Sequence, residues 1–393
     1  MIQKMQSSRF LLKLTIMMIG GFAFLQVYSI QAILPVLMEH FSASKVQAGL
    51  TVGVTVMAVA IMSPVMGMFS DAVGRKSLIV ICMLLIVFPT ALLSISENIT
   101  QIKLWRFLQG LFVPGVTVVT IAYISEEFPD RLASMLSLYV SGTVLGGFSG
   151  RFLIGYLHSI VGWQTGYLIF AGLMLIGVIW AALVLPASKN FVVSGNFRSS
   201  LHILRQHIQN PHVLTACALG ACVLFSLVSI FTFINLHLAD DPYYLSSANL
   251  ANIFTVYLIG MLITPLTAKL IHNVGIANSL LLAIMSSIIG ALITLCSPLW
   301  LIIVGLIIMS SGVFISQATT ISHISQHVNQ GRSLASGLYY MCYYTGGSIG
   351  AWVCGISYTY FGWSGVVFTV VLLQIVALNI VFFGIKLAKR TTP

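Results

Sequence analysis

The chain has 393 residues, of which 58% are hydrophobic and only 7% are charged, and its mean hydropathy is +1.02. A soluble domain is typically about one quarter charged, so this composition excludes an ordinary water-facing protein and indicates an integral membrane protein. The net charge of +10 is dispersed over many segments, so we expect no nucleic-acid partner.

The apolar runs are long enough for membrane-spanning helices, which need about 20 residues each. The first run continues to about Leu34 without a small-residue cleavage pattern, which favours a retained span over a secretory signal. In chain order the sequence predicts spans near residues 12–34, 46–68, 77–96, 101–124, 133–157, 164–185, 212–237, 247–270, 276–295, 298–322, 333–357 and 362–387.

Twelve spans place both termini on one side of the membrane, and the basic residues predict which side that is. If the termini are inside, the outer segments hold just Lys45 and Lys103, while the other basic residues outside the spans fall on the inner side. Cytoplasmic loops carry such an excess of Lys and Arg. We therefore predict a multi-pass protein of the bacterial inner (cytoplasmic) membrane with both termini cytoplasmic.

One polar and basic segment, 187–211, is longer than the other connections and divides the chain into two parts. The sequence predicts an N-terminal six-helix bundle at 1–186, a cytoplasmic linker at 187–211 and a C-terminal six-helix bundle at 212–393. His202 and His207 in this segment and His212 directly after it recur at five-residue spacing, which does not place them on one helix face. We therefore favour a solvated linker and expect no metal site and no cofactor.

An internal repeat relates the two parts. Residues 138–163 and 338–363 align without gaps and are identical at Leu138/Leu338, Tyr139/Tyr339, Gly146/Gly346, Gly147/Gly347, Gly150/Gly350, Gly155/Gly355, Gly162/Gly362 and Trp163/Trp363. Within this stretch Gly142, Gly146 and Gly150 share one helical face, and small residues at that spacing let membrane helices approach closely. We expect tight packing of the fifth and eleventh spans at a gate between the two halves.

The stretch GMFSDAVGRK concentrates charge between the second and third spans. It resembles the loop signature of the major facilitator superfamily at Gly67, Asp71, Gly74, Arg75 and Lys76, although Ala72 stands where a basic residue is common. RFLQG (106–110) resembles the fourth-span motif, and SGTVLGGFSGR (141–151) resembles the glycine-rich motif of the antiporter branches. YSIQAILPVLMEHFSAS (28–44) resembles the first span of drug:proton antiporters. The resemblance implies an all-α integral membrane fold with twelve transmembrane helices in two six-helix bundles related by pseudo-twofold symmetry.

The charges of this loop have a physical use in gating. Asp71 can lie at the N-terminus of a neighbouring helix, where the helix dipole favours an anion. Arg75 can reach a carboxylate of ISEEFPDR, where Glu126 and Glu127 lie. We expect these residues to latch the cytoplasmic end when the transporter is open outward. The alternative is that Arg75 and Lys76 only fix the topology.

Two full charges, Arg106 and Arg151, lie well inside the spans, where charges are functional candidates by default. The alternative for both is snorkelling to the outer surface. The resemblance supports Arg106 as a cavity residue coupled to protons, and two cavity arginines favour an anionic substrate. The further candidates for substrate binding are Gln109, Tyr28, Gln31, Asn235, Gln317, Tyr340, Tyr343 and Tyr344. No Asp or Glu lies mid-span, which leaves the proton site open.

The sequence predicts a secondary active transporter that moves small organic molecules across the inner membrane by alternating access, with protons as the coupling ion and export as the direction. The alternative is transport of an anionic metabolite such as a carboxylate siderophore, with import as a possible direction. No Gly-x-x-x-x-Gly-Lys-Ser/Thr motif occurs, so direct use of ATP is not expected. A membrane enzyme is disfavoured because the few acidic residues cluster in loops.

Overall fold

The computed structural model describes residues 2–188, 204–328 and 332–387; at positions 2–9, 68, 71–73, 133, 332, 333, 386 and 387 it describes the backbone alone. The elements of the first half are α1 (Ile2–Tyr28), η1 (Ser29–Ile33), α2 (Leu34–Phe41), α3 (Lys45–Val73), α4 (Arg75–Leu93), α5 (Ile99–Glu127), η2 (Pro129–Arg131) and α6 (Leu132–Val184). Those of the second half are α8 (Pro211–Ala239), α9 (Ser247–Ile253), η3 (Phe254–Leu258), α10 (Ile259–Ile293), α11 (Leu299–His327), α12 (Arg332–Val381) and η4 (Phe382–Leu387).

Glycines divide the longest helices into pairs of spans. Nine helical ranges of the described chain are long and apolar enough to cross a membrane. Three of them contain one non-helical glycine each, namely Gly162 (φ 81°), Gly275 (φ 80°) and Gly362 (φ 61°). Positive φ is costly for residues with a Cβ but not for glycine. Each of the three ranges thus makes two spans, and the twelve predicted spans are confirmed.

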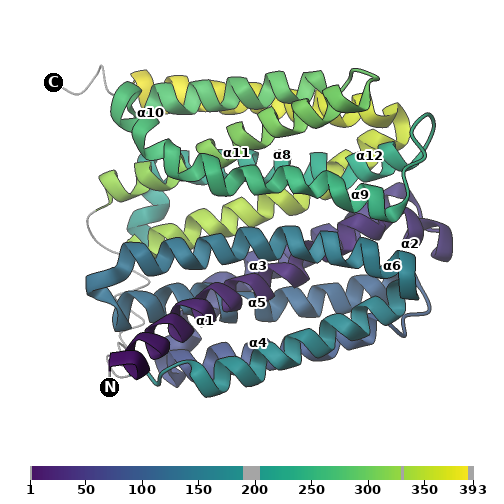
Figure 1. The fold of residues 1–393 in the computed structure, drawn as a ribbon. Helices are drawn as coiled ribbons and strands as arrows, with labels where there is room; N and C mark the ends of the chain where they lie inside the picture. The colour runs from purple at the N-terminus through teal and green to yellow at the C-terminus, as the bar shows by residue number, and fades with distance from the viewer. Residues whose placement is uncertain (1, 189–203, 329–331, 388–393) are drawn as a thin grey trace.

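A fourth glycine, Gly74 (φ 94°), makes the corresponding turn between α3 and α4. We call the end of the molecule with this turn the basic end, because Arg75, Lys76 and Lys269 lie there, and the opposite end the far end. The beginning of α1 and the end of α12 also lie at the basic end (Figure 1). Gly74 and Gly275 hold equivalent places in the two halves, as do Gly162 and Gly362.

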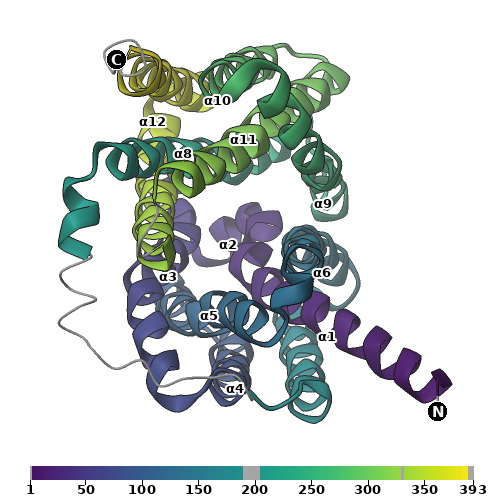
Figure 2. The same ribbon diagram turned by 90° about the vertical axis from the view of Figure 1, so that its left-hand side faces the viewer.

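The spans pack into two groups that stand side by side (Figures 1 and 2). In the first half α1 packs on α6, and α3 and α4 pack on α5; in the second half α8 packs on α12 and α10 on α11. The halves meet where α3 contacts α12 and where α6 contacts α9. Large apolar side chains such as Ile176, Leu183 and Phe368 are exposed on the outside, as expected for a surface that faces lipid.

Local signals in the sequence start several of these helices. Ser44 caps α3 with a reciprocal pair of hydrogen bonds to Gln47, and Asn98 caps α5 by accepting from the first free backbone N–H groups. Asn210 does the same for α8 by accepting from the backbone N–H of His212, and Pro211 at the first helical position has no N–H that needs a partner. Such caps satisfy donors that have no partner within the helix.

The glycine-rich face of the fifth span packs against the first span. A Cβ at Gly142, Gly146 or Gly150 would collide with backbone atoms of α1, at Met17, Gly21 and Leu25 respectively. In the second half, a Cβ at Gly346 or Gly350 would meet the backbone of α8 at Ala221 and Phe225. Tight packing is confirmed, but its expected place between the halves is wrong: both contacts join helices within one half.

Candidate functional site

A cavity of about 360 Å³ lies between the two halves, nearer to the basic end. Both halves contribute to its wall, and most of the lining side chains are aromatic or carry a hydroxyl. The aromatic and hydroxyl-bearing residues of the wall are Phe24, Tyr28, Ser63, Thr117, Tyr139, Thr143, Tyr257, Thr264, Phe314, Tyr340, Tyr343 and Tyr344, and Gln317 adds an amide. Among the described residues that line it, none is charged. The wall therefore suits an organic molecule of modest size better than an inorganic ion.

At the far end, small residues of α3 bring the halves into contact. A Cβ at Gly49 would press on the ring of Phe233 and the carbonyl of Ala351, and one at Gly53 would lie 3.1 Å from the Ala351 Cβ. The Lys45 Nζ lies 4.7 Å from the ring centre of Tyr358 across the same boundary. The halves are thus closed against each other at the far end, while the cavity lies toward the basic end.

Arg151 lies directly behind the cavity wall. Its guanidinium carbon is 4.5 Å from the ring centre of Tyr28, 4.4 Å from that of Tyr257 and 4.9 Å from that of Phe254. Its Nη1 donates to the carbonyl of Gly147 at 2.7 Å. Aromatic faces attract cations, so the rings and the carbonyl offset part of the cost of burying this charge. Tyr28 and Tyr257 separate the guanidinium from the space that a substrate would occupy.

Gln31 connects Arg151 to the opposite half of the molecule. The Nε of Arg151 donates to Gln31 Oε1 at 2.7 Å, and Gln31 Nε2 donates to Thr232 Oγ1 on α8 at 2.8 Å. All three side chains are buried. This chain of hydrogen bonds spans α6, η1 and α8, so a movement of one half relative to the other must break or rearrange it.

Arg106 is fully buried but is not part of the cavity wall. Its guanidinium donates to the carbonyls of Gln26 (2.6 Å) and Val27, to the carbonyl of Thr51 (3.4 Å) and to Gln109 Oε1 (2.7 Å). The first two carbonyls lie where α1 ends and η1 begins. A helix that breaks inside a membrane leaves carbonyls that water cannot reach, and Arg106 supplies their donors.

The remaining sequence-predicted residues fall into two groups. Tyr28, Gln317, Tyr340, Tyr343 and Tyr344 line the cavity together. Gln109 and Asn235 do not: Gln109 Nε2 donates to Thr90 Oγ1 at 2.8 Å inside the first half, and Asn235 Nδ2 donates to its own helix at the carbonyl of Phe231. Substrate binding by Gln109, Asn235 and Arg106 stays a prediction, with no contact to the cavity in its favour.

The charged loop at the basic end forms an ion pair within the first half. Arg75 Nη2 lies 2.6 Å from Glu126 Oε1 and Arg75 Nε lies 3.1 Å from Glu126 Oε2, so the pair is bidentate. It joins the start of α4 to the end of α5. The side chain of Asp71 lies outside the described residues. A Cβ at Gly67 would meet just Val118 Cγ1, at 4.0 Å, so close helix approach does not explain this glycine.

Comparison with known proteins gives the family. Residues 16–351 match the model of the Major Facilitator Superfamily. The chain belongs to the major facilitator superfamily. It is 32% identical over 391 residues to an uncharacterized transporter of Buchnera aphidicola subsp. Schizaphis graminum, covering 99% of this chain and 94% of that protein. It is 29% identical over 373 residues to the inner membrane transport protein YnfM of Escherichia coli, covering 94% and 89%.

The fold agrees with this assignment. The crystal structure of a bacterial homolog of the human lysosomal transporter Spinster, in an inward-facing and unoccupied conformation, superposes with a TM-score of 0.81 at 16% identity, over 98% of this chain and 99% of that one. The chain is therefore a membrane-spanning secondary transporter of two six-helix halves and not an enzyme. The drug:proton antiporter branch stays a prediction.

Several wall residues of this superfamily member were not predicted. Tyr257 and Phe314 are single aromatic residues in apolar runs, and nothing in the sequence distinguishes them from lipid-facing ones. Tyr139 was noted as a match of the internal repeat but not as a wall residue. The far-end contact of Gly49 and Gly53 was also missed. The sequence did carry a signal for this contact, because Gly49 and Gly53 recur at the same four-residue spacing as Gly142, Gly146 and Gly150.

The Arg75–Glu126 pair gives a prediction for the basic end. Glu126→Gln removes the charge that the buried Arg75 guanidinium faces, so we expect a loss of about 1–2 kcal/mol of stability and reduced transport. Thermal unfolding of the detergent-purified protein and uptake in proteoliposomes measure these effects. Asp130→Asn is the control, because Asp130 is exposed at the same end. Equal behaviour of the two variants would show that the pair contributes nothing.

Proposed function

We propose that this transporter exports small organic molecules by alternating access, with protons as the coupling ion, and that its basic end faces the cytoplasm. The observation that carries the proposal is the cavity of about 360 Å³ between the halves, with aromatic and hydroxyl-bearing walls. The basic loops support the orientation. The contact between α3 and α12 at the far end fits a state whose cavity is reached from the cytoplasm.

The chemistry of the wall supports a substrate with aromatic or apolar groups. Tyr340, Tyr343 and Tyr344 come from one stretch of α12, and Tyr28 and Tyr257 face them from the other helices. Tyrosine offers a large apolar ring for stacking and a hydroxyl that can donate or accept a hydrogen bond. A small hydrophilic cation would find no carboxylate in the described wall, and its loss of hydration would not be compensated.

A second candidate is a carboxylate-bearing molecule, and Arg151 favours it. Its partners are an amide oxygen, a backbone carbonyl and three aromatic rings. None of these carries a full negative charge. An anion in the cavity would therefore be attracted across Tyr28 and Tyr257, and a change of their rotamers would permit a charge-assisted hydrogen bond.

The proposal is tested by transport in proteoliposomes with an imposed pH gradient, for an aromatic carboxylate and for an aromatic cation of similar size. Export coupled to protons requires that flux follow the pH gradient. For the second candidate, Arg151→Ala should lower transport of the carboxylate about tenfold or more while the cation is handled no worse, since each 1.4 kcal/mol of lost binding is a factor of ten. Arg151→Lys keeps the charge without the planar fork and should fall between.

Arg131→Ala is the matched control, because Arg131 is exposed in η2 at the basic end. Thermal unfolding of each variant separates loss of folding from loss of transport. If flux of both compounds ignores the pH gradient, proton coupling is wrong. If Arg151→Ala lowers transport of both compounds equally, Arg151 serves the inter-half hydrogen bonds to Gln31 and Thr232, and the carboxylate candidate fails.

A further inference from the structure

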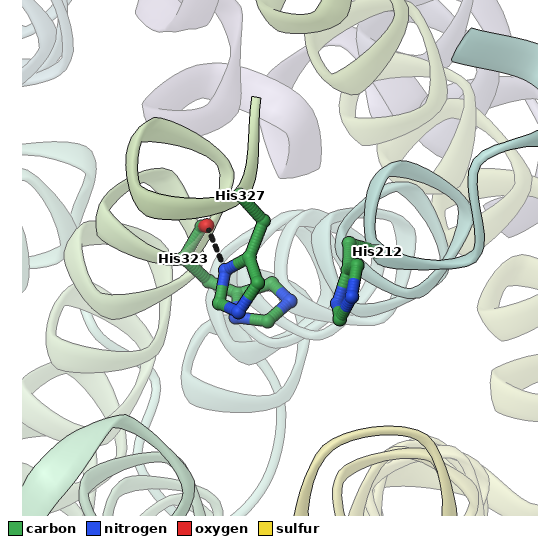
Figure 3. A group of neighbouring side chains, drawn as sticks. All are labelled: His212, His323 and His327. Atoms are coloured by element: carbon green, nitrogen blue, oxygen red, sulfur yellow. Dashed lines mark hydrogen bonds between the residues drawn. The ribbon is translucent and has the colours of Figure 1, made fainter. Parts of the chain in front are cut away.

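Three histidines from distant parts of the chain gather at the basic end of the second half (Figure 3). His212 is in the first turn of α8, and His323 and His327 lie one turn apart near the end of α11. One ring nitrogen from each lies within 4.8 Å of the others. His323 is buried, and the other two are half-buried.

The rings already pack against one another. The ring centres of His212 and His327 are 4.2 Å apart, those of His323 and His327 are 4.2 Å apart, and those of His212 and His323 are 5.4 Å apart. Nitrogens that share one tetrahedral zinc ion lie about 3.3 Å apart, because each Zn–N bond is about 2.0–2.1 Å long. Ring rotations that move each nitrogen by about 1 Å would bring the three to that spacing.

A backbone carbonyl holds the ring of His327 in place for such a role. His327 Nδ1 lies 2.9 Å from the carbonyl oxygen of His323, so the tautomer that donates there leaves Nε2 free to bind a metal ion. Metal-binding histidines commonly donate their second nitrogen in this way. His323 and His327 are four residues apart and therefore lie on one helix face. On α8, the backbone N–H of His212 is held by the Asn210 side chain at 2.9 Å.

We propose that His212, His323 and His327 form a binding site for a divalent transition-metal ion, with zinc as the best-suited ion. Three neutral imidazoles and no carboxylate make up the group, a donor set that suits Zn²⁺, Co²⁺, Ni²⁺ or Cu²⁺ and not Mg²⁺ or Ca²⁺. Water would complete the coordination. The bound ion would join the beginning of α8 to the end of α11, the helix that also carries the cavity residue Gln317.

This site replaces the grouping suggested by the sequence, where His212 appeared with His202 and His207. His202 lies outside the described residues. The partners of His212 instead come from more than a hundred residues further along the chain, so the spacing within the linker was not informative. The four-residue spacing of His323 and His327 is visible in the sequence, but the pair was not recognised there.

The test is metal binding by the purified full-length chain in detergent after treatment with a chelator. Co²⁺ is added first, because its visible absorption reports a tetrahedral nitrogen site, and Zn²⁺ then displaces it. We expect one ion per chain and a zinc-dependent rise in the unfolding temperature. His212→Gln, His323→Gln and His327→Gln should each weaken binding about 100-fold or more, since even changes beyond the ligands cost about 10–100-fold.

His272→Gln is the matched control, because His272 is exposed on α10 near the same end. It should bind Co²⁺ and Zn²⁺ as the unmodified chain does. The proposal is overturned if the unmodified chain binds neither ion. It is also overturned if a cluster variant that, without metal, unfolds at the same temperature as the unmodified chain binds the ions as tightly as His272→Gln does. Neither measurement involves transport, so the result is independent of the proposed function.

Discussion

Substitution of alanine for Gly146 is expected to abolish folded protein, although it adds one methyl group. The new Cβ would lie inside contact distance of the carbonyl of Gly21 on α1, and its nearest three atoms are all backbone atoms. Backbone cannot rotate away as the end of a side chain can, so α6 and α1 must separate along their shared face. Close approach of small residues is the main source of stability for such a helix pair in a membrane.

The effect should be specific to position. Gly172→Ala is the control, because a Cβ there would meet nothing within 4 Å. Gly67→Ala should also be tolerated, since its new Cβ would make one ordinary contact. The measurements are the yield of monodisperse protein in size-exclusion chromatography and its unfolding temperature. Normal yield and stability of Gly146→Ala would contradict the packing of α1 against α6.

The internal repeat extends this result to the second half. Gly346→Ala would press on the backbone of Ala221, and Gly346 aligns with Gly146 in the sequence repeat. We expect the same loss of folded protein. The repeat was therefore a sound guide to which helices pack closely. The repeat did not predict that the packing partners are the first helices of each half. A stripe of glycines indicates that another helix lies close, but it does not identify that helix.

The sequence predicted spans better than it predicted sites. Span number followed from length and hydropathy, and Gly74, Gly162, Gly275 and Gly362 marked turns that only glycine makes easily. The tyrosines of α12 were predicted as wall residues because four of them fall within six positions. Tyr257 and Phe314 were not, since their role depends on which face of a long apolar helix turns toward the other half.

The two intramembrane arginines illustrate the limit most clearly. Each appeared as an unpaired charge at similar depth, so the same interpretation was applied to both. The structure separates them: Arg151 lies behind the cavity wall among aromatic rings, whereas Arg106 binds the carbonyls at the break in the first span. Gln26, Ser29 and Gln31 lie at that break and Pro35 follows it, but these signals were outweighed because hydropathy treats the whole of 12–34 as one helix.

Arg106 therefore gives the second large prediction. Arg106→Ala should prevent folding, because the carbonyls of Gln26, Val27 and Thr51 would lose a donor in a region without water. A buried group left unsatisfied costs about 1–3 kcal/mol, although the carbonyls of Gln26 and Thr51 keep the hydroxyl donors of Ser29 and Thr55 at 3.3 Å. Removal of this fully buried side chain also leaves a cavity, so the total cost is on the order of several kcal/mol. Arg106→Lys should fail almost as badly, since one ammonium cannot reach the carbonyls that a planar fork reaches together.

A third variant distinguishes this structural role from the role in substrate binding or proton coupling that the sequence suggested. Arg106→Gln has no charge but keeps two N–H donors. If Arg106 acts through its donors, Arg106→Gln should recover part of the folded yield and unfolding temperature, and more than Arg106→Lys recovers. If instead Arg106→Lys folds and transports normally while Arg106→Gln folds and does not transport, the charge itself is required. Arg106 would then belong to the transport machinery, and its contacts to the first span would be secondary.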